Sequence, residues 1–387
     1  SRYDFRYNVL TEETEYRLLE RMEEGFAPVN QRVLNTFCLE AHESGISCWD
    51  RDLSRCIFST RIAEYHPFKL YLEELPVWDG VDRLASLARR VSRDQLWVEE
   101  FHIWMRGMTA QWMGVTGSHA NSVAPLLIST EQGYLKSTFC KSLLPPVLQR
   151  YYMDKVDLTS QGYIERRLAE MGLLNLDEFD TLSPARMQEL KSLITQDVMN
   201  ERKVYDIQNY TFIRRASFIA STNNPHCLPD IGENRRILFN TLLEIDYHTP
   251  VNHQGIYAQA YALYQQGFQY WYENQEITFL NNRNEAFRQK DPLEENLFFY
   301  FRAASPNDIQ AKWYPASQLL SILSMNGRTQ ANAQMKQMLV TVLENNHFHS
   351  RKTSNNITEY WVVEYSAEER KENSIRPQLP VQTGLEL

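Results

Sequence analysis

Three short apolar runs, each followed by polar residues, constrain the fold of this chain more than any other feature. The runs are "VAPLLIS", "MGLLNLDEFD" and "ASFIASTNN", and segments with helical periodicity separate them. This alternation is typical of a mostly parallel sheet that helices cover. The sequence therefore predicts an α/β core that begins near residue 119 and ends near residue 250.

The first run leads into "LLISTEQGYLKSTFCKSL", a segment with the layout of a phosphate-binding loop. In such loops, backbone N–H groups surround the phosphates, a lysine contacts the β- and γ-phosphates, and a hydroxyl group binds Mg²⁺. Lys136 and Ser137 occupy the positions for the last two tasks, between a predicted strand and a predicted helix. The alternative is an ordinary strand–turn–helix with Lys136 as a surface charge.

The loop departs from the pattern G-x-x-x-x-G-K-[ST] at two glycines. Thr130 stands at the first and Leu135 at the last, and only the central Gly133 remains. A residue other than glycine can line such a loop if its φ is negative, but a β-carbon directly before the lysine narrows the approach of phosphate. We therefore expect ATP binding and leave the efficiency of hydrolysis open.

The second run ends in Asp177 and Glu178. An aspartate in this place can hold the Mg²⁺ shell, and a glutamate can polarise the attacking water. The plainer alternative is a solvated strand end.

The third run ends in Asn223 and Asn224, and "IGENRRILF" follows with Arg235 and Arg236. An asparagine at the end of the strand beside the loop strand can contact the γ-phosphate or the attacking water, although Asn-Asn-Pro also forms ordinary turns. The arginines suit an arginine finger that a neighbouring subunit supplies, although isolated arginines more often form surface ion pairs. The four features in order are stronger evidence than any one of them.

With "YHPFKLYLEELPVWDGVDRL" ahead of it, this set resembles the VirE family (virulence-associated E-like proteins), which belongs with phage- and plasmid-type superfamily 3 helicases within the AAA+ group. The resemblance covers about residues 30–245 and depends on "HPF…YL…L…WDG…RL", "EQGYLKSTF", "LNLDEFD" and "NRR". It implies a P-loop AAA+ ATPase core with ATP and Mg²⁺ as cofactors. By matching positions, it implies that the phosphates are bound by Gly133, Lys136, Ser137 and Thr138. It implies that the metal is bound by Ser137 and Asp177. The catalytic residues that it implies are Lys136, Glu178, Asn223, Arg235 and Arg236.

Family members of this type form hexameric rings whose central hairpins bind single-stranded DNA. The matching interval here is "NERKVYDIQNYTFIRR", with two strand-like arms around "DIQN". Basic groups suit phosphate contacts and aromatic rings suit contacts with bases or sugars. The candidates are Arg202 and Lys203 for phosphate and Tyr205 or Tyr210 for base or sugar. The alternative is a plain surface hairpin with Arg214 and Arg215 at its base.

Four further regions surround the core. We predict a helical N-terminal region (1–118, with "TEYRLLERM", "VDRLASLARR" and "VEEFHIWMRGM"), a helical connector (251–299), a winged-helix-like domain (300–366) and a flexible tail (367–387). The region after 300 has the order helix, helix, hairpin and looks like the C-terminal domain of Bacteroides-type relatives. Its candidate DNA contacts are Arg351 and Lys352, with Lys336, His347 and His349 nearby, and the alternative is a protein-interaction module.

The formal net charge of −9 argues against a protein that coats nucleic acid nonspecifically, so DNA affinity should be local and salt-dependent. No apolar run approaches the roughly 18–20 residues that span a bilayer, and the N-terminus lacks a secretory pattern. We expect a cytoplasmic protein with no membrane partner. Because the chain begins with Ser1, an upstream domain such as a primase is an open alternative.

The five cysteines contain no C-x-x-C pair, which suits reduced thiols better than a disulfide framework. Cys38, His42, Cys48 and Cys56 form a conceivable zinc set, but their spacing matches no common zinc module. Buried thiols and a surface histidine are the simpler interpretation.

The leading hypothesis is an ATP-dependent DNA helicase, translocase or remodeller of a mobile element or phage-type replication system. It would act as a homo-oligomeric, hexameric ring on single-stranded or forked DNA, with replication or transposition proteins as possible partners. One alternative is a hydrolysis-impaired nucleotide switch that assembles an initiation, transposition or defence complex on DNA. Another is a non-enzymatic adaptor that binds DNA through the winged helix.

Overall fold

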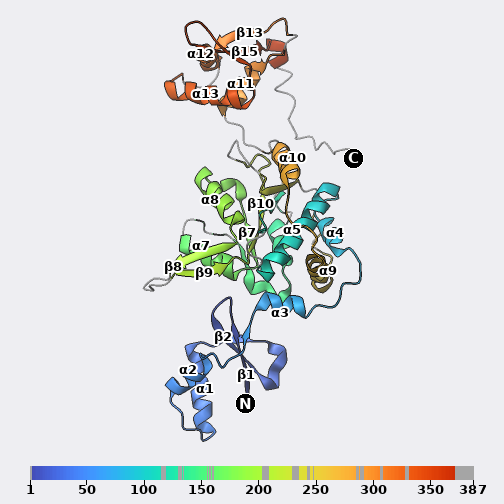
Figure 1. Cartoon of the computed structure of the whole chain (residues 1–387), viewed down its shortest axis with the longest axis vertical. Helices are drawn as coiled ribbons and strands as arrows, with labels where there is room; N and C mark the ends of the chain where they lie inside the picture. The colour runs from blue at the N-terminus through green and yellow to red at the C-terminus, as the bar shows by residue number, and fades with distance from the viewer. Residues whose placement is uncertain are drawn as a thin grey trace. The chain divides into compact units, whose positions relative to one another are not determined.

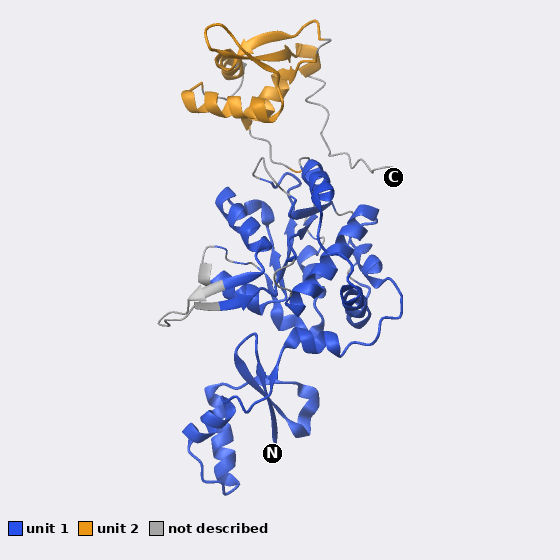
Figure 2. Ribbon diagram, in the orientation of Figure 1, with its two compact units in different colours: residues 1–285 blue, residues 286–387 orange. Residues whose placement is uncertain are grey.

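The computed structural model of the chain forms two compact units, residues 1–285 and 286–387 (Figure 2). It describes residues 2–114, 119–129, 133, 135–154, 156, 158, 161–202, 209–228, 235–241, 245–246, 248–284, 287, 292–305, 308–326 and 331–370. In the part that is described, no helix is both long and apolar enough to cross a membrane.

A five-stranded sheet with all strands parallel forms the centre of the first unit. Its order is β11-β5-β10-β7-β6. The strands are β5 (Ala124–Ile128), β6 (Tyr152–Asp154), β7 (Leu173–Leu176), β10 (Ser217–Thr222) and β11 (Ile237–Thr241). All residues of β5, β7 and β10 are buried, as expected for a sheet covered on both faces. The predicted α/β core with a mostly parallel sheet is confirmed.

Helices cover both faces of this sheet (Figure 1). On one side lie α5 (Gln95–Met113) and α9 (His253–Gln265), and on the other lie α7 (Gln161–Glu170) and α8 (Pro184–Thr195). The longest of them, α5, is anchored by two buried indoles: Trp104 donates to the carbonyl of Phe218 and Trp112 to that of Gly172, each at 3.1 Å. Further helices around this sheet are α3 (Pro67–Glu73), α4 (Arg83–Ala88), α6 (Lys136–Ser142) and α10 (Asn274–Asn284), with short 3-10 turns η2 (Pro146–Tyr151) and η3 (Phe179–Thr181).

The N-terminal residues form a small sheet, of order β3-β2-β1-β4, instead of helices. Its strands are β1 (Tyr3–Asn8), β2 (Glu13–Leu18), β3 (Ala27–Pro28) and β4 (Glu64–Tyr65). Along the chain, the 3-10 helix η1 (Leu19–Glu24) lies between β2 and β3, and the helices α1 (Gln31–Glu43) and α2 (Asp50–Ile57) lie between β3 and β4. The helical prediction is therefore wrong for Tyr3–Asn8 and Glu13–Leu18, which includes the first half of "TEYRLLERM", while Leu19–Glu24 forms a short 3-10 helix. Thr14 and Tyr16 favour extended backbone, and the pairing of β2 with β1 supplies hydrogen bonds that a local helical pattern cannot reveal.

A β-hairpin separates β7 from β10 along the chain, as predicted. Its arms are β8 (Val198–Arg202) and β9 (Asn209–Ile213), and the antiparallel register runs from Val198 opposite Ile213 to Arg202 opposite Asn209. Figure 1 shows the hairpin extending from the side of the unit that carries α7.

The second unit contains α11 (Pro292–Tyr300), β12 (Phe301–Ala303), β13 (Lys312–Pro315), α12 (Ala316–Asn326), α13 (Ala333–Asn345), β14 (Ser350–Lys352) and β15 (Thr358–Glu364). The central strand β15 pairs with β12, β13 and β14. The two helices and the hairpin after residue 315 agree with the predicted order, and Asn356 makes the turn with a φ of 59°.

Candidate functional site

The polar residues that follow β5, β10 and β7 meet at one edge of the parallel sheet. The register places Thr222 beside Ile128 and Ala220 beside Leu176, so that the three strands end close to one another. In open α/β sheets, ligands bind in the crevice outside the carboxyl ends of the strands. Strand β10 lies directly beside the loop strand β5, as predicted, and it also separates β5 from the acidic strand β7.

The Lys136 side chain is the centre of this site. Its Nζ donates hydrogen bonds to Ser129 Oγ and to Asn223 Oδ1, both at 2.5 Å. Burial lowers the pKa of Lys136, while the charge of Asp177 acts in the opposite direction. Because both acceptors are neutral oxygens, the ammonium group is well placed to attract an anion.

Asp177 is held between two hydroxyl groups. Ser221 Oγ donates to its Oδ1 at 2.5 Å, and Ser137 Oγ lies 3.4 Å from its Oδ2. Two oxygens that share an octahedral Mg²⁺ at its usual bond length lie about 2.9 Å apart. Oxygen is the ligand that Mg²⁺ prefers, so Ser137 and Asp177 fit the predicted metal site in chemistry, and their oxygens would approach each other by about 0.5 Å to share the ion.

Leu135 adopts a left-handed backbone conformation, with φ 52° and ψ 33°, immediately before Lys136. A residue other than glycine was expected to fit here only with a negative φ, and that condition is not met. The loop therefore keeps the backbone that a glycine would adopt, at a cost of about 1–2 kcal/mol for an L-residue. Gly133 also has a positive φ, 95°, and Thr130 lies outside the described residues.

Glu178 has the second left-handed backbone at this site, with φ 53°. The next residue, Phe179, is fully buried, whereas Glu178 is exposed. The backbone N–H and the hydroxyl of Thr181 both donate to the Glu178 carbonyl, at 2.9 and 2.8 Å. This turn holds the Glu178 carboxylate in solvent beside Asp177, where a water can reach it.

Asn223, and not Asn224, is the asparagine that contacts the lysine. The side chain of Asn224 instead accepts a hydrogen bond from the backbone N–H of His226. Thr138 is exposed on the first turn of α6. Sequence reasoning missed the serine and threonine hydroxyls at the same edge, although they directly flank the predicted residues: Ser129 bonds Lys136, Ser221 bonds Asp177, and Thr222 bonds Asp180.

Arg235 and Arg236 lie at the opposite edge of the sheet. They precede β11, and the backbone N–H of Ala124, the first residue of β5, donates to the Arg236 carbonyl. Lys136 follows the other end of β5, and a five-residue strand spans about 17 Å. The structure therefore does not bring these arginines together with the lysine of the same chain.

The base of the β8–β9 hairpin is fixed by buried arginines rather than by surface charges. Arg214 is completely buried, and its guanidinium donates to the carbonyls of Leu193, Ile194 and Asn121. Arg215 donates to the carbonyl of Trp112. Burial lowers the pKa of Arg214 to about 9 and that of Arg215 to about 10.

The predicted DNA-contacting residues of the hairpin are only partly covered by the structure. Arg202 ends β8 and Tyr210 lies on β9, but their side chains are outside the description. Lys203 and Tyr205 lie outside the described residues. The strand pairing that would present these residues is confirmed, and the contacts themselves stay a prediction.

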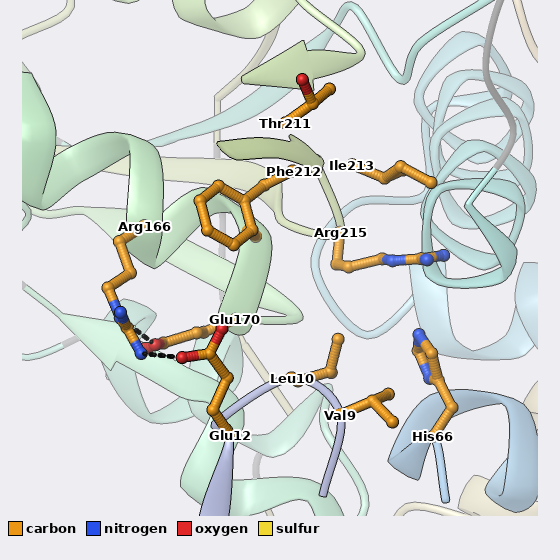
Figure 3. A pocket seen from close by; sticks show the side chains of 11 residues that line it. Val9, Leu10, Glu12, His66, Arg166, Glu170, Thr211, Phe212, Ile213 and Arg215 are labelled. Atoms are coloured by element: carbon orange, nitrogen blue, oxygen red, sulfur yellow. Dashed lines mark hydrogen bonds and ion pairs between the residues drawn. The ribbon is translucent and has the colours of Figure 1, made fainter. Parts of the chain in front are cut away.

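A cavity of about 200 Å³ lies where the hairpin base meets the N-terminal sheet. Figure 3 shows the side chains of His66 and Arg215 directed toward the same space, while Arg166 bridges Glu12 and Glu170 on the other side. Burial lowers the pKa of His66 to about 3, and the positive charges of Arg215 and Lys69 add to the effect. His66 is therefore neutral in the folded protein at ordinary pH.

In the second unit, the predicted basic residues differ in whether their side chains are held by described contacts or exposed to solvent. Arg351 is paired with Glu359 at 2.8 Å and lies over the Trp313 ring. Lys352 and Lys336 are exposed, as are His347 and His349. A new contact of Arg351 with phosphate would compete with its ion pair.

Comparison with known proteins identifies the family. Residues 72–289 match the virulence-associated protein E-like domain, which covers more than half of the chain, so the chain belongs to this family. The predicted resemblance to VirE proteins is thereby confirmed at the level of the family. No curated protein matches the chain.

Among solved structures, the apo structure of the NrS-1 C-terminal region is similar, with a TM-score of 0.48, 14% sequence identity and coverage of 94% of this chain and 96% of that chain. The A form of the same apo region gives a TM-score of 0.47 and 12% identity, with the same coverage of both chains.

The backbone conformations of Leu135 and Gly133 predict changes in the free energy of unfolding that have opposite signs at the two positions. Leu135→Gly should raise the free energy of unfolding by about 0.5–1 kcal/mol, because relief of the left-handed strain exceeds the added entropy of the unfolded chain. Gly133→Ala should lower the free energy of unfolding by about 1 kcal/mol, because alanine is strained at a φ of 95°. No described atom lies within 4 Å of the added β-carbon, so steric contact does not add to this loss. Urea unfolding of the two variants measures both changes, and a loss of stability in Leu135→Gly would contradict the assigned backbone.

The low pKa of His66 yields a prediction of pH dependence. As the pH falls below 6.5, the unfolded chain binds a proton at His66, whereas the folded protein does not until about pH 3, so acid favours unfolding. Wild type should lose about 2 kcal/mol more stability between pH 7 and pH 5 than His66→Asn, which keeps a helix-capping side chain. Urea unfolding at the two pH values tests this, and equal losses would show that His66 is not held neutral.

Proposed function

We propose that this chain is an ATPase with a P-loop AAA+ core that acts on DNA as a ring-forming helicase, translocase or remodeller. One observation carries the proposal: at the carboxyl edge of the parallel sheet, the Lys136 ammonium lies on Asn223 and Ser129 while Ser137 faces Asp177. A lysine, an amide, a hydroxyl and a carboxylate from three neighbouring strands and one helix are the groups that nucleotide hydrolysis needs.

Lys136 is proposed to bind the β- and γ-phosphates. In the structure its charge is partly desolvated and its two described hydrogen bonds are to neutral oxygens, so an arriving phosphate gains a stronger interaction than either acceptor provides. Gly133 and Thr138 are proposed to line the same phosphate site, from the loop and from the first turn of α6. Asn223, once released from Lys136, is placed to donate its amide N–H to the γ-phosphate or the attacking water.

Ser137 and Asp177 are proposed to hold Mg²⁺, which when bound supplies positive charge to the phosphate oxygens. Ser221 keeps Asp177 oriented through its short hydrogen bond. Glu178 is proposed to orient and deprotonate the attacking water, since its carboxylate is exposed next to Asp177.

Arg235 and Arg236 are proposed to act on the nucleotide of a neighbouring subunit. Within one chain they lie at the wrong edge of the sheet, about a strand's length from Lys136. A guanidinium at the opposite edge can complete a site only if another copy is placed against it, which favours an oligomer, and we propose the hexameric ring of superfamily 3 helicases.

Single-stranded or forked DNA is proposed as the substrate, bound by the β8–β9 hairpin through Arg202, Lys203, Tyr205 and Tyr210. The buried Arg214 ties the hairpin base to α8 and to the segment before β5, so a movement in the core has a rigid connection to the hairpin. The second unit adds a winged-helix-like surface with Arg351 and Lys352. We place the protein in the cytoplasmic replication system of a phage or mobile element, with replication or transposition proteins as partners.

Steady-state ATP hydrolysis with and without single-stranded DNA tests the chemistry. Lys136→Ala and Glu178→Gln should each lower turnover at least about 100-fold, because the first removes the phosphate contact and the second the base. Lys141→Ala is the matched control, since Lys141 is an exposed lysine on the same helix, and it should keep wild-type turnover. Absence of turnover in wild type, with ATP still bound through Lys136, would favour the nucleotide switch. Binding of DNA without binding of ATP would favour the adaptor.

Mixing inactive variants tests the role of the arginines. Lys136→Ala retains the arginines but lacks a working site, whereas Arg235→Ala or Arg236→Ala retains the site but lacks one arginine. If either arginine acts between subunits, its variant should be inactive alone and should regain turnover when mixed with Lys136→Ala. A mixture that never exceeds the sum of its separate activities would show that neither arginine acts on the site of a neighbouring subunit.

A further inference from the structure

Two cysteines and a histidine meet at the N-terminal side of the molecule, far in sequence from the sheet edge described above. Cys38 and His42 lie on α1, and Cys48 lies in the segment between α1 and α2. Their sulfur atoms and an imidazole nitrogen all lie within 4.8 Å of one another. Of the set considered from the sequence, Cys56 is not part of this group and is exposed on α2.

The local fold explains why residues at such unusual spacing come together. Cys38 and His42 are four residues apart and therefore share one face of α1. The helix then closes with hydrogen bonds from Gly45 to the His42 carbonyl and from Ile46 to the Ala41 carbonyl, and the φ of 77° at Gly45 reverses the chain. This reversal returns Cys48 to the face that carries the other two.

His42 is oriented by a hydrogen bond of the kind that accompanies metal-binding histidines. Its Nε2 lies 2.7 Å from the Cys48 carbonyl oxygen. Because a carbonyl only accepts, Nε2 must carry the proton, and the lone pair of the ring is then on Nδ1. Such a contact to a backbone carbonyl fixes both the tautomer and the direction of a ligating imidazole.

We propose that Cys38, His42 and Cys48 bind one zinc ion. Two sulfurs and one imidazole nitrogen are ligands that zinc prefers, and three protein ligands leave a fourth position for water or for a nearby carboxylate. In tetrahedral zinc sites the ligand atoms are about 3.4–3.8 Å apart, so small side-chain rotations from the present spacing suffice. The ion would join the segment after α1 to the helix itself and fix the start of α2.

Zinc binding by this group has one chemical requirement: both cysteines ligate as thiolates, so uptake of the ion releases the thiol protons. A disulfide between Cys38 and Cys48 would leave the oriented His42 without a role, so we favour the metal.

The test uses the purified chain, reduced and stripped of metal, titrated with zinc against a chromophoric chelator. Wild type should bind one zinc per chain, and Cys38→Ser and Cys48→Ser should each weaken binding at least about 100-fold. Cys56→Ser is the matched control and should bind as wild type does. With Co²⁺ in place of zinc, wild type and Cys56→Ser should show thiolate-to-metal charge-transfer absorption, and the other two variants should lose it.

Circular dichroism checks that each variant is folded, and ATP binding through Lys136 checks that the distant site is intact. Equal zinc affinity in all four proteins would overturn the proposal. So would a reduced, folded wild-type protein that binds no zinc at micromolar concentration, or recovery of a Cys38–Cys48 disulfide with no cobalt spectrum.

Discussion

The hydrogen bonds of Lys136 with Asn223 and Ser129 depend on one constraint, the insertion of β10 between β5 and β7. Parallel pairing on both sides of β10 brings three strand ends to the same edge, and only there can residues about 40 to 90 positions apart in sequence share a site. The fully buried strands tolerate little displacement, because the interior is closely packed. The sheet therefore fixes the positions of the groups that Lys136 contacts. The loop between β5 and α6 has only to bring Lys136 to them.

The two left-handed residues at this site show where the chain gives up local stability. Leu135 and Glu178 have a backbone that costs L-residues about 1–2 kcal/mol each, and such strain tends to gather at functional sites. At Leu135 the chain keeps the conformation of a glycine loop while it lacks the glycine. The substitution thus changes the side chain directly before Lys136 and leaves the left-handed backbone of this one residue in place.

Several arginines of this molecule serve its structure. Arg214 and Arg215 would be counted as basic surface from the sequence, yet both are buried against backbone carbonyls at the root of the hairpin. Arg351 is held by Glu359. These contacts remove positive charge from the exposed surface, whereas Lys336 and Lys352 are exposed.

The sequence by itself determined the α/β core, the hairpin between its second and third predicted strands, and the order helix, helix, hairpin near the C-terminus. It also placed Lys136 at the start of a helix and Asp177, Glu178 and Asn223 at strand ends, because periodicity and strand-end polarity are local properties. It misjudged Tyr3–Asn8 and Glu13–Leu18, where pairing between β1 and β2 overrides local helical spacing. Only the tertiary structure decided that Asn223 rather than Asn224 contacts the lysine, that Arg235 and Arg236 lie at the far edge of the sheet, and that Cys48 returns to Cys38 and His42. Each of these depends on which strands pair and where a turn reverses the chain, and long-range pairing leaves no mark in a single stretch of sequence.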